Sequence, residues 1–136
     1  MPGMNTELAI LVFARAPVAG AAKTRLIPQL GAAGAAALHS ELLLHTLVTA
    51  RAAAPARLEL WCAPDVLHPA LREAAQRHDA TLHAQQGAGL GARMSHAFAD
   101  ALQRSHMALC IGTDCPALTA THLRQAAAVL ESGRDA

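Results

Sequence analysis

The sequence predicts an α/β fold: a three-layer αβα domain with a mostly parallel sheet built from Rossmann-like βαβ units. Segments with strand character and segments with helix character alternate four times along the 136 residues, which is typical of a parallel sheet with helices on both faces. The length fits one domain, and 53% hydrophobic with 15% charged residues is a globular composition. We therefore expect residues 1–136 to form a single domain.

Four segments are expected to form the strands. Residues 8–14 (LAILVFA) are continuously apolar, as in a strand that is buried on both faces of a parallel sheet. Residues 57–62 (RLELWC) alternate between polar and apolar side chains and lie between two prolines, which also favours a strand. The segments 80–84 and 107–112 complete the predicted sheet.

Four segments are expected to form the helices. In the first of them, Leu43, Leu47 and Ala50 recur at the spacing of a single helix face, which predicts an amphipathic helix packed on the sheet. Thr119 or Thr121 is the expected N-cap of the last helix, because a threonine side chain can accept a hydrogen bond from a free backbone amide. The predicted helices cover residues 33–53, 66–78, 91–105 and 119–131.

Composition excludes several classes of function. A net charge of +1 with only 2% aromatic residues argues against a nucleic-acid binder, which needs basic and stacking surfaces. No apolar stretch approaches the roughly 20 residues of a membrane span, and the first apolar run lacks a basic leader. The cysteines Cys62, Cys110 and Cys115 form no CxxC pair, so we expect reduced, buried thiols in a cytoplasmic protein.

The loop after the first strand gathers cations. Residues 13–31 (FARAPVAGAAKTRLIPQLG) contain Arg15, Arg25 and the only lysine of the chain, Lys23. Gly20 permits a close backbone approach, and three cations can neutralise a di- or triphosphate. The alternative is a solvated basic loop, but the low overall charge and the position after a buried strand favour a phosphate site. Ligands of open α/β sheets bind at this edge.

Two known phosphate-binding motifs do not fit. The Walker A pattern requires glycine directly before the lysine, whereas Ala22 precedes Lys23, and Pro17 stands where the first glycine belongs. Residues 87–92 (GAGLGA) satisfy the permissive dinucleotide pattern, but this fingerprint belongs after the first strand of a βαβ unit. We expect instead a turn that enters the helix containing Arg93, and the N-terminus of a helix can face an anion.

Asp114 is the candidate metal ligand. It follows an apolar strand and precedes Cys115 and Pro116, so its carboxylate should leave the sheet at the mouth of the site. Capping of a turn or helix is an equally good explanation of its position alone. Opposite a group of phosphate-binding cations, however, a carboxylate is well placed to hold Mg²⁺ or Mn²⁺. The eight histidines are scattered and are expected on the surface or in the core.

Three motifs together resemble a known family. The segments FARAPVAGAAKTRL, GAGLGARM and IGTDCPAL are similar to motifs of small bacterial GT-A-fold proteins, the radical-SAM/selenodomain-associated transferases. This group is glycosyltransferase-like and is distantly related to molybdenum-cofactor guanylyltransferases and phospholactate guanylyltransferases. The resemblance covers almost the whole chain, in the order and spacing of the family. It implies a nucleotide-diphospho-sugar transferase fold.

The resemblance also implies roles for particular residues. Gly89, with Leu90 and Gly91, would lie near the base or ribose, and Asp114 would bind the Mg²⁺ or Mn²⁺ cofactor. Gly89 and Ala92 stand where relatives often carry acidic residues, so the nucleoside itself is not assigned. The nucleotide phosphates would be held by Arg15, Pro17, Gly20, Lys23, Thr24 and Arg25.

The resemblance further implies that the family's C-terminal part is missing. Relatives continue with another strand and a glycine-rich segment, whereas this sequence stops at Ala136. A chain truncated in this way is expected to lack turnover by itself and to expose an apolar sheet edge through which a homodimer could form.

The expected function is that of a metal-dependent, glycosyltransferase-like enzyme whose partner is a nucleoside diphosphate sugar. Two alternatives stay open: a nucleotidylyltransferase that uses a nucleoside triphosphate and a phosphorylated acceptor, and a catalytically inactive nucleotide-binding module.

Overall fold

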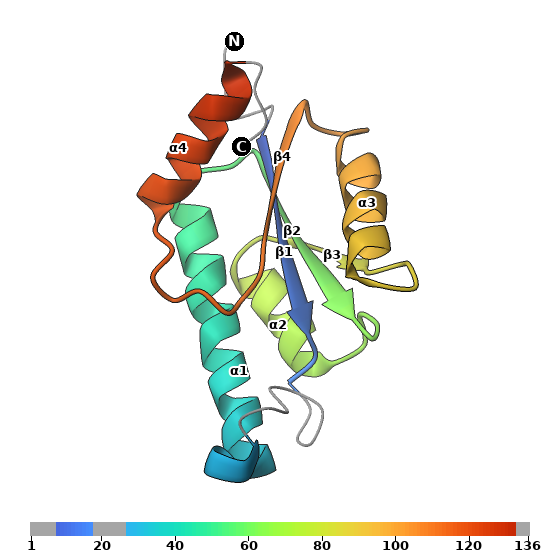
Figure 1. Cartoon of the computed structure of the whole chain (residues 1–136), viewed down its shortest axis with the longest axis vertical. Coiled ribbons are helices and arrows are strands. Elements are labelled where there is room, and N and C mark those ends of the chain that lie inside the picture. Colours follow the sequence, from blue (N-terminus) through green and yellow to red (C-terminus); the bar gives the residue numbers. More distant parts are fainter. Residues whose placement is uncertain (1–7, 18–26, 133–136) are drawn as a thin grey trace.

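The computed structural model describes residues 8–17 and 27–132 and contains each of the predicted strands and helices (Figure 1). Only boundaries differ, mostly by a few residues. In chain order the elements are β1 (Leu8–Arg15), α1 (Ile27–Ala52), β2 (Arg57–Ala63), α2 (Pro69–Arg77), β3 (Thr81–Ala84), α3 (Leu90–Ala101), β4 (Met107–Ile111) and α4 (Ala120–Glu131).

The described strands form one sheet with the order β3-β2-β1-β4, in which every pairing is parallel. The register sets Phe13 of β1 beside Trp61 of β2, and Val12 of β1 beside Ile111 of β4. Because β1 has a neighbour on each side and helices above and below, residues 9–12 are completely buried. The continuous apolar run predicted this environment, and the prediction of a mostly parallel sheet is confirmed.

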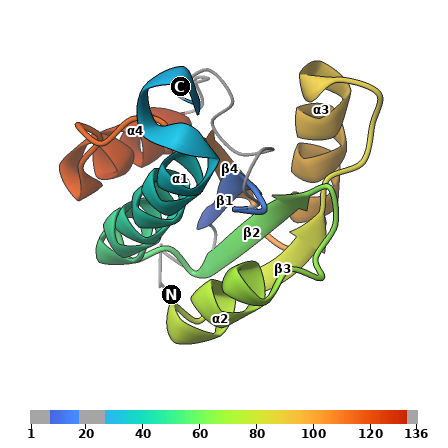
Figure 2. The same ribbon diagram turned by 90° about the horizontal axis from the view of Figure 1, so that it is seen from below.

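Helices cover both faces of the sheet, as the αβα prediction requires (Figure 2). One core cluster joins α1, α2 and α4 to one face of β1, where Ile10 and Val12 belong to the same cluster as the predicted stripe on α1. A second, smaller cluster lies on the opposite face, where Ala97 and Ala101 of α3 pack with Leu11 and Trp61. Alternate residues of β1 therefore serve the two cores, as the period of a strand dictates.

The first and last helices begin for different local reasons. Within α1, Gly31 has φ 73° and ψ 163°, a conformation that interrupts the helix and that a residue with a side chain adopts only with strain. The long straight part therefore starts just after it, close to the predicted residue 33. In α4, the Thr119 hydroxyl accepts a hydrogen bond from the amide of His122, and the His122 imidazole accepts one from the Thr119 amide. Thr119 is thus the N-cap, one of the two predicted residues.

The expectation of three buried cysteines is partly wrong. Cys62 is buried in the centre of the sheet and Cys110 is half-buried on β4, whereas Cys115 is exposed in the loop after β4. Burial raises the pKa of the Cys62 thiol to about 12, with a smaller contribution from Asp65. All three thiols are free. Among residues 8–17 and 27–132, none of the helices combines the length and apolar character needed to cross a membrane.

Candidate functional site

A cavity of about 460 Å³ opens at the carboxyl ends of β1 and β4. It is bounded by the end of β1, by α1, by the segment that leads from β3 into α3, and by the loop after β4. Three of the predicted site residues, Arg15, Gly89 and Asp114, come from separate parts of the sequence and line this one cavity. The described residues that line it are Phe13, Ala14, Arg15, His39, Gln85, Ala88, Gly89, Leu90, Arg93, Gly112, Thr113 and Asp114.

Arg15 forms the β1 wall of the cavity. It is the last residue of the strand and is exposed, and its guanidinium has no hydrogen bond or ion pair within the described part of the chain. Its backbone carbonyl oxygen accepts a hydrogen bond from Nε2 of His39 at 2.6 Å. Because a carbonyl can only accept, His39 Nε2 carries the proton. His39 is 4% exposed, so it is a core histidine that fastens α1 to the end of β1.

The segment before α3 is a tight turn, as predicted for the glycine-rich motif. Gly87 has φ 139°, and a Cβ placed on it would lie 2.8 Å from Ala92 Cβ and 2.9 Å from the backbone nitrogen of Arg93. Only glycine fits there. Gly89 is the N-cap of α3 and has no side chain to cap it, so the first amides of this helix are available to an anion in the cavity. Gly91, also predicted, is exposed on α3 and does not line the cavity.

Two polar residues of this wall were not assigned from the sequence. Arg93 lies in the first turn of α3, and its Nε donates to the carbonyl oxygen of Gly87 at 3.1 Å. Gln85 follows β3, and its Nε2 donates to the carbonyl oxygen of Trp61 at 2.9 Å. The position of Arg93 directly after a glycine turn was a usable signal, but nothing in the spacing showed that this turn would share a cavity with the end of β1.

The loop after β4 carries Asp114 into the cavity. Thr113 is 6% exposed and Asp114 is exposed, so the loop turns outward between these two residues. Two residues farther on, the carbonyl oxygen of Pro116 lies 3.1 Å from Nε2 of His45, which fastens this loop to α1. Within the described residues, no group of three or more His, Cys, Asp or Glu side chains could hold a metal ion. Asp114 could thus supply one ligand of a metal, but the described residues do not form a complete metal site by themselves.

The remaining predicted phosphate-binding residues are Gly20, Lys23, Thr24 and Arg25, and they lie outside the described residues. Pro17 is described and is half-buried just after β1, but it does not line the cavity. The phosphate-binding role of this loop stays a prediction, although its first cation, Arg15, does line the cavity.

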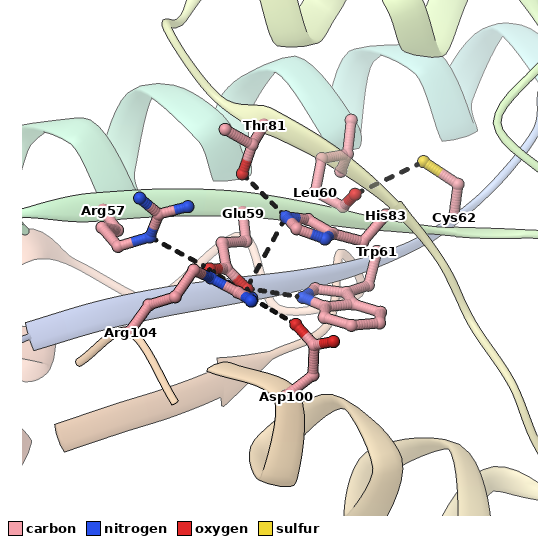
Figure 3. Close-up of polar contacts among 9 residues, drawn as sticks. All are labelled: Arg57, Glu59, Leu60, Trp61, Cys62, Thr81, His83, Asp100 and Arg104. Carbon is pink, nitrogen blue, oxygen red and sulfur yellow. Dashed lines mark hydrogen bonds and ion pairs between the residues drawn. The ribbon is translucent and has the colours of Figure 1, made fainter. Parts of the chain in front are cut away.

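A second polar region, the Glu59 cluster, lies on the side of the sheet that faces α3 (Figure 3). It consists of Arg57, Glu59, Trp61, His83, Asp100 and Arg104. Glu59 is completely buried. Its carboxylate accepts hydrogen bonds from Trp61 Nε1 at 3.0 Å, from Arg104 Nη2 at 3.1 Å and from Arg57 Nε at 3.3 Å.

The charges of the Glu59 cluster are matched within the chain. Arg104 also forms an ion pair with Asp100, and His83 Nε2 lies 3.8 Å from Glu59. The His83 ring stacks on Trp61 with 4.6 Å between the ring centroids. Burial lowers the pKa of His83 below its usual value, and the Glu59 carboxylate opposes this shift. Every carboxylate oxygen of Glu59 is satisfied, which marks the cluster as a structural feature.

Comparison with known proteins identifies the family. The family model described as "Uncharacterized protein conserved in bacteria (DUF2064)" matches residues 46–135. The chain belongs to this family. The matched part of the DUF2064 chain includes β2 through α4, and therefore the glycine turn, Arg93 and Asp114. The search of curated proteins found no match.

A solved structure is similar over nearly the whole chain. It comes from Desulfovibrio desulfuricans G20 and is described as a "putative nucleotide-diphospho-sugar transferase". The match has a TM-score of 0.79 and 28% sequence identity, and it covers 93% of this chain and 55% of the solved chain. The DUF2064 chain thus spans about half the length of that protein. The predicted nucleotide-diphospho-sugar transferase fold is confirmed.

Proposed function

We propose that this DUF2064 chain binds a nucleoside diphosphate sugar in the cavity at the carboxyl ends of β1 and β4, as part of a metal-dependent, glycosyltransferase-like enzyme. One observation carries the proposal: an arginine at the end of β1, the uncapped N-terminus of α3 and a carboxylate in the loop after β4 line the same cavity. The likeness to a structure described as a transferase of this class supports the choice of ligand.

The diphosphate is the part of the ligand that these groups would bind. Arg15 offers charge-assisted hydrogen bonds, and the amides at the start of α3 offer uncharged ones together with the positive end of the helix dipole. From the family resemblance, Lys23, Thr24 and Arg25 would add to the same phosphate site, with Gly20 permitting close approach. The base and the sugar would then extend along the rest of the cavity, past Gly89.

A Mg²⁺ or Mn²⁺ ion would complete the charge balance, and Asp114 is the residue that would hold it. Such an ion is commonly bound by one or two carboxylates, with phosphate oxygens and waters as its other ligands, so a single carboxylate fits a site that the substrate completes. When bound, the metal neutralises charge on the departing nucleoside diphosphate. The protein would mainly bind and orient the phosphates, because transfers of this kind ask for little covalent work from the enzyme.

The test is a thermal-shift measurement of nucleoside diphosphates, their sugars and triphosphates, each with and without Mn²⁺. The wild-type protein should be stabilised by a nucleoside diphosphate sugar, and more so with Mn²⁺, because a ligand that binds only the folded state raises stability. Asp114→Asn should abolish the Mn²⁺-dependent part and leave the melting temperature without ligand unchanged. Glu131→Gln, at the exposed end of α4, is the matched control and should respond like the wild type.

An unchanged Mn²⁺ response in Asp114→Asn would contradict the metal assignment, and no stabilisation by any nucleotide would contradict the proposal as a whole. Analysis of the products then separates the chemistries. Release of a nucleoside diphosphate identifies glycosyl transfer, and release of pyrophosphate would identify nucleotidyl transfer instead. Binding without either product would identify a nucleotide-binding module.

A further inference from the structure

Arg93 brings a second arginine to the cavity that Arg15 lines. The two residues are 78 positions apart in sequence, and they belong to different elements: Arg15 ends β1, and Arg93 lies in the first turn of α3. Arg93 is half-buried, so part of its side chain packs on the protein while part faces the cavity.

The turn before α3 holds the Arg93 guanidinium in place. Its Nε–H donates a hydrogen bond to the Gly87 carbonyl oxygen. The two terminal nitrogens of the planar guanidinium have no partner among the described residues, so their hydrogens can be donated to a ligand. These are the nitrogens that pair with two oxygens of one phosphate. The anchor depends on Gly87, because its positive φ disfavours other residues and an added Cβ would lie only 2.8–2.9 Å from atoms of Ala92 and Arg93.

Other arginines of the chain form ion pairs with carboxylates. Arg104 is bound by Glu59 and Asp100, and Arg77 is bound by Glu73 on the same helix. Among the described residues no carboxylate lies within ion-pair distance of Arg93. A fork that is oriented by its own backbone anchor, faces a cavity and has no internal counter-charge is suited to an external anion.

We propose that Arg93 is a second anion-binding residue of the cavity and that it binds the diphosphate of the ligand from the α3 side, while Gly87 sets the position of its guanidinium. The choice of a diphosphate rests on the proposed function, but the anion site itself rests on Arg93 and its anchor. The α3 amides and the Arg93 fork then act on the same group, because both belong to the first turn of one helix.

The test measures binding of two probes, inorganic pyrophosphate and a nucleoside diphosphate, by calorimetry, with the matching nucleoside as a third ligand. Arg93→Ala should weaken binding of both phosphorylated probes at least tenfold, since a charge-assisted hydrogen bond is lost, and should leave nucleoside binding unchanged. Arg93→Lys keeps the charge but not the fork or the Nε anchor and should recover only part of the loss. Arg72→Ala, an exposed arginine on α2, is the matched control and should bind like the wild type.

Gly87→Ala tests the anchor separately. It retains Arg93 but should displace the guanidinium, so binding of pyrophosphate should fall although no charge has been removed. The melting temperature of each variant without ligand shows whether it is folded. If Arg93→Ala does not fold, the comparison of Arg93→Lys with the wild type decides the role of Arg93.

The possible outcomes distinguish failure of the Arg93 proposal from failure of the proposed function. Equal pyrophosphate binding by the wild type, Arg93→Ala and Arg93→Lys would overturn the role of Arg93 and leave the proposed function standing. Pyrophosphate binding that depends on Arg93, without any nucleotide binding, would overturn the proposed function and support the anion site. A wild-type protein that binds neither probe would overturn both.

Discussion

The Glu59 cluster and the cavity use the same side-chain types in opposite ways. Glu59 is completely buried and lies within hydrogen-bonding distance of Arg57 and Arg104. In the cavity, neither Arg15 nor Arg93 has a carboxylate partner among the described residues, and Asp114 is exposed. Arginine near a carboxylate is therefore not in itself a sign of function. What distinguishes the arginines of the two regions is whether a described carboxylate supplies their counter-charge.

The difference has an energetic consequence. Burying a carboxylate costs several kcal/mol unless cations and hydrogen bonds compensate for it, so each partner in the Glu59 cluster contributes to stability. In the cavity, Arg15 is exposed and loses little hydration on folding. Substitutions in the first region should therefore change stability, and substitutions in the second should change ligand binding.

The largest expected effect is that of Glu59→Ala. The change leaves Arg57 and Arg104 without their shared carboxylate and Trp61 Nε1 without an acceptor, and loss of one partner of a buried charged group costs about 3–5 kcal/mol. Urea denaturation should show this decrease in the free energy of unfolding.

The control for this prediction is Glu73→Gln. Glu73 pairs with Arg77 on the surface of α2, where both side chains are more than half exposed, and such pairs contribute about 0.5 kcal/mol or less. A decrease of similar size in both variants would show that the buried Glu59 carboxylate contributes no more to stability than a surface ion pair.

Arg15→Ala should give the reverse result. Because the Arg15 guanidinium has no partner in the described residues, its loss should change the free energy of unfolding by no more than about 0.5 kcal/mol. Binding of a nucleoside diphosphate, measured by calorimetry, should weaken about tenfold or more through loss of a charge-assisted bond. If Arg15→Ala instead lowered the free energy of unfolding and left nucleotide binding unchanged, Arg15 would have a structural role. The cavity and the Glu59 cluster would then not differ in the way proposed.

The smallest expected effect concerns the pH dependence of His83. Burial lowers its pKa in the folded state, and Glu59, Arg104, Asp100 and Arg57 modify the shift. The unfolded chain therefore takes up a proton first as the pH falls below about 6.5, and stability should decrease from that pH downward. His83→Gln should show a smaller decrease between pH 7 and pH 5 in denaturation measurements.

At pH 8 and above, the imidazole is neutral in both the folded and the unfolded state. The difference in the free energy of unfolding between the wild type and His83→Gln should therefore not vary with pH in this range. Parallel curves for the two proteins between pH 7 and pH 5 would contradict a desolvated His83 in the Glu59 cluster.

Much of the fold follows from local pattern. The apolar run of β1, the stripe on α1 and the cap at Thr119 each depend on residues within a few positions of one another, and each prediction is confirmed. The exposed position of Cys115 was missed because apolar character suggests burial but does not show where a loop turns outward. The burial of Glu59 was also not predicted. Its alternation with apolar neighbours indicated a strand, but the partners that compensate for its charge include Arg104, 45 residues away.

By itself the sequence determined the order of the elements, the parallel sheet, the glycine turn before α3 and the candidacy of Arg15 and Asp114. Only the tertiary structure decided that Arg93 joins these residues at one cavity, and that Arg57 and Arg104 are instead occupied by Glu59. The physical reason is range. Helix caps, turns and strand periodicity arise from neighbours along the chain, whereas the counter-charge of an arginine is set by whichever side chain the packing brings within about 4 Å.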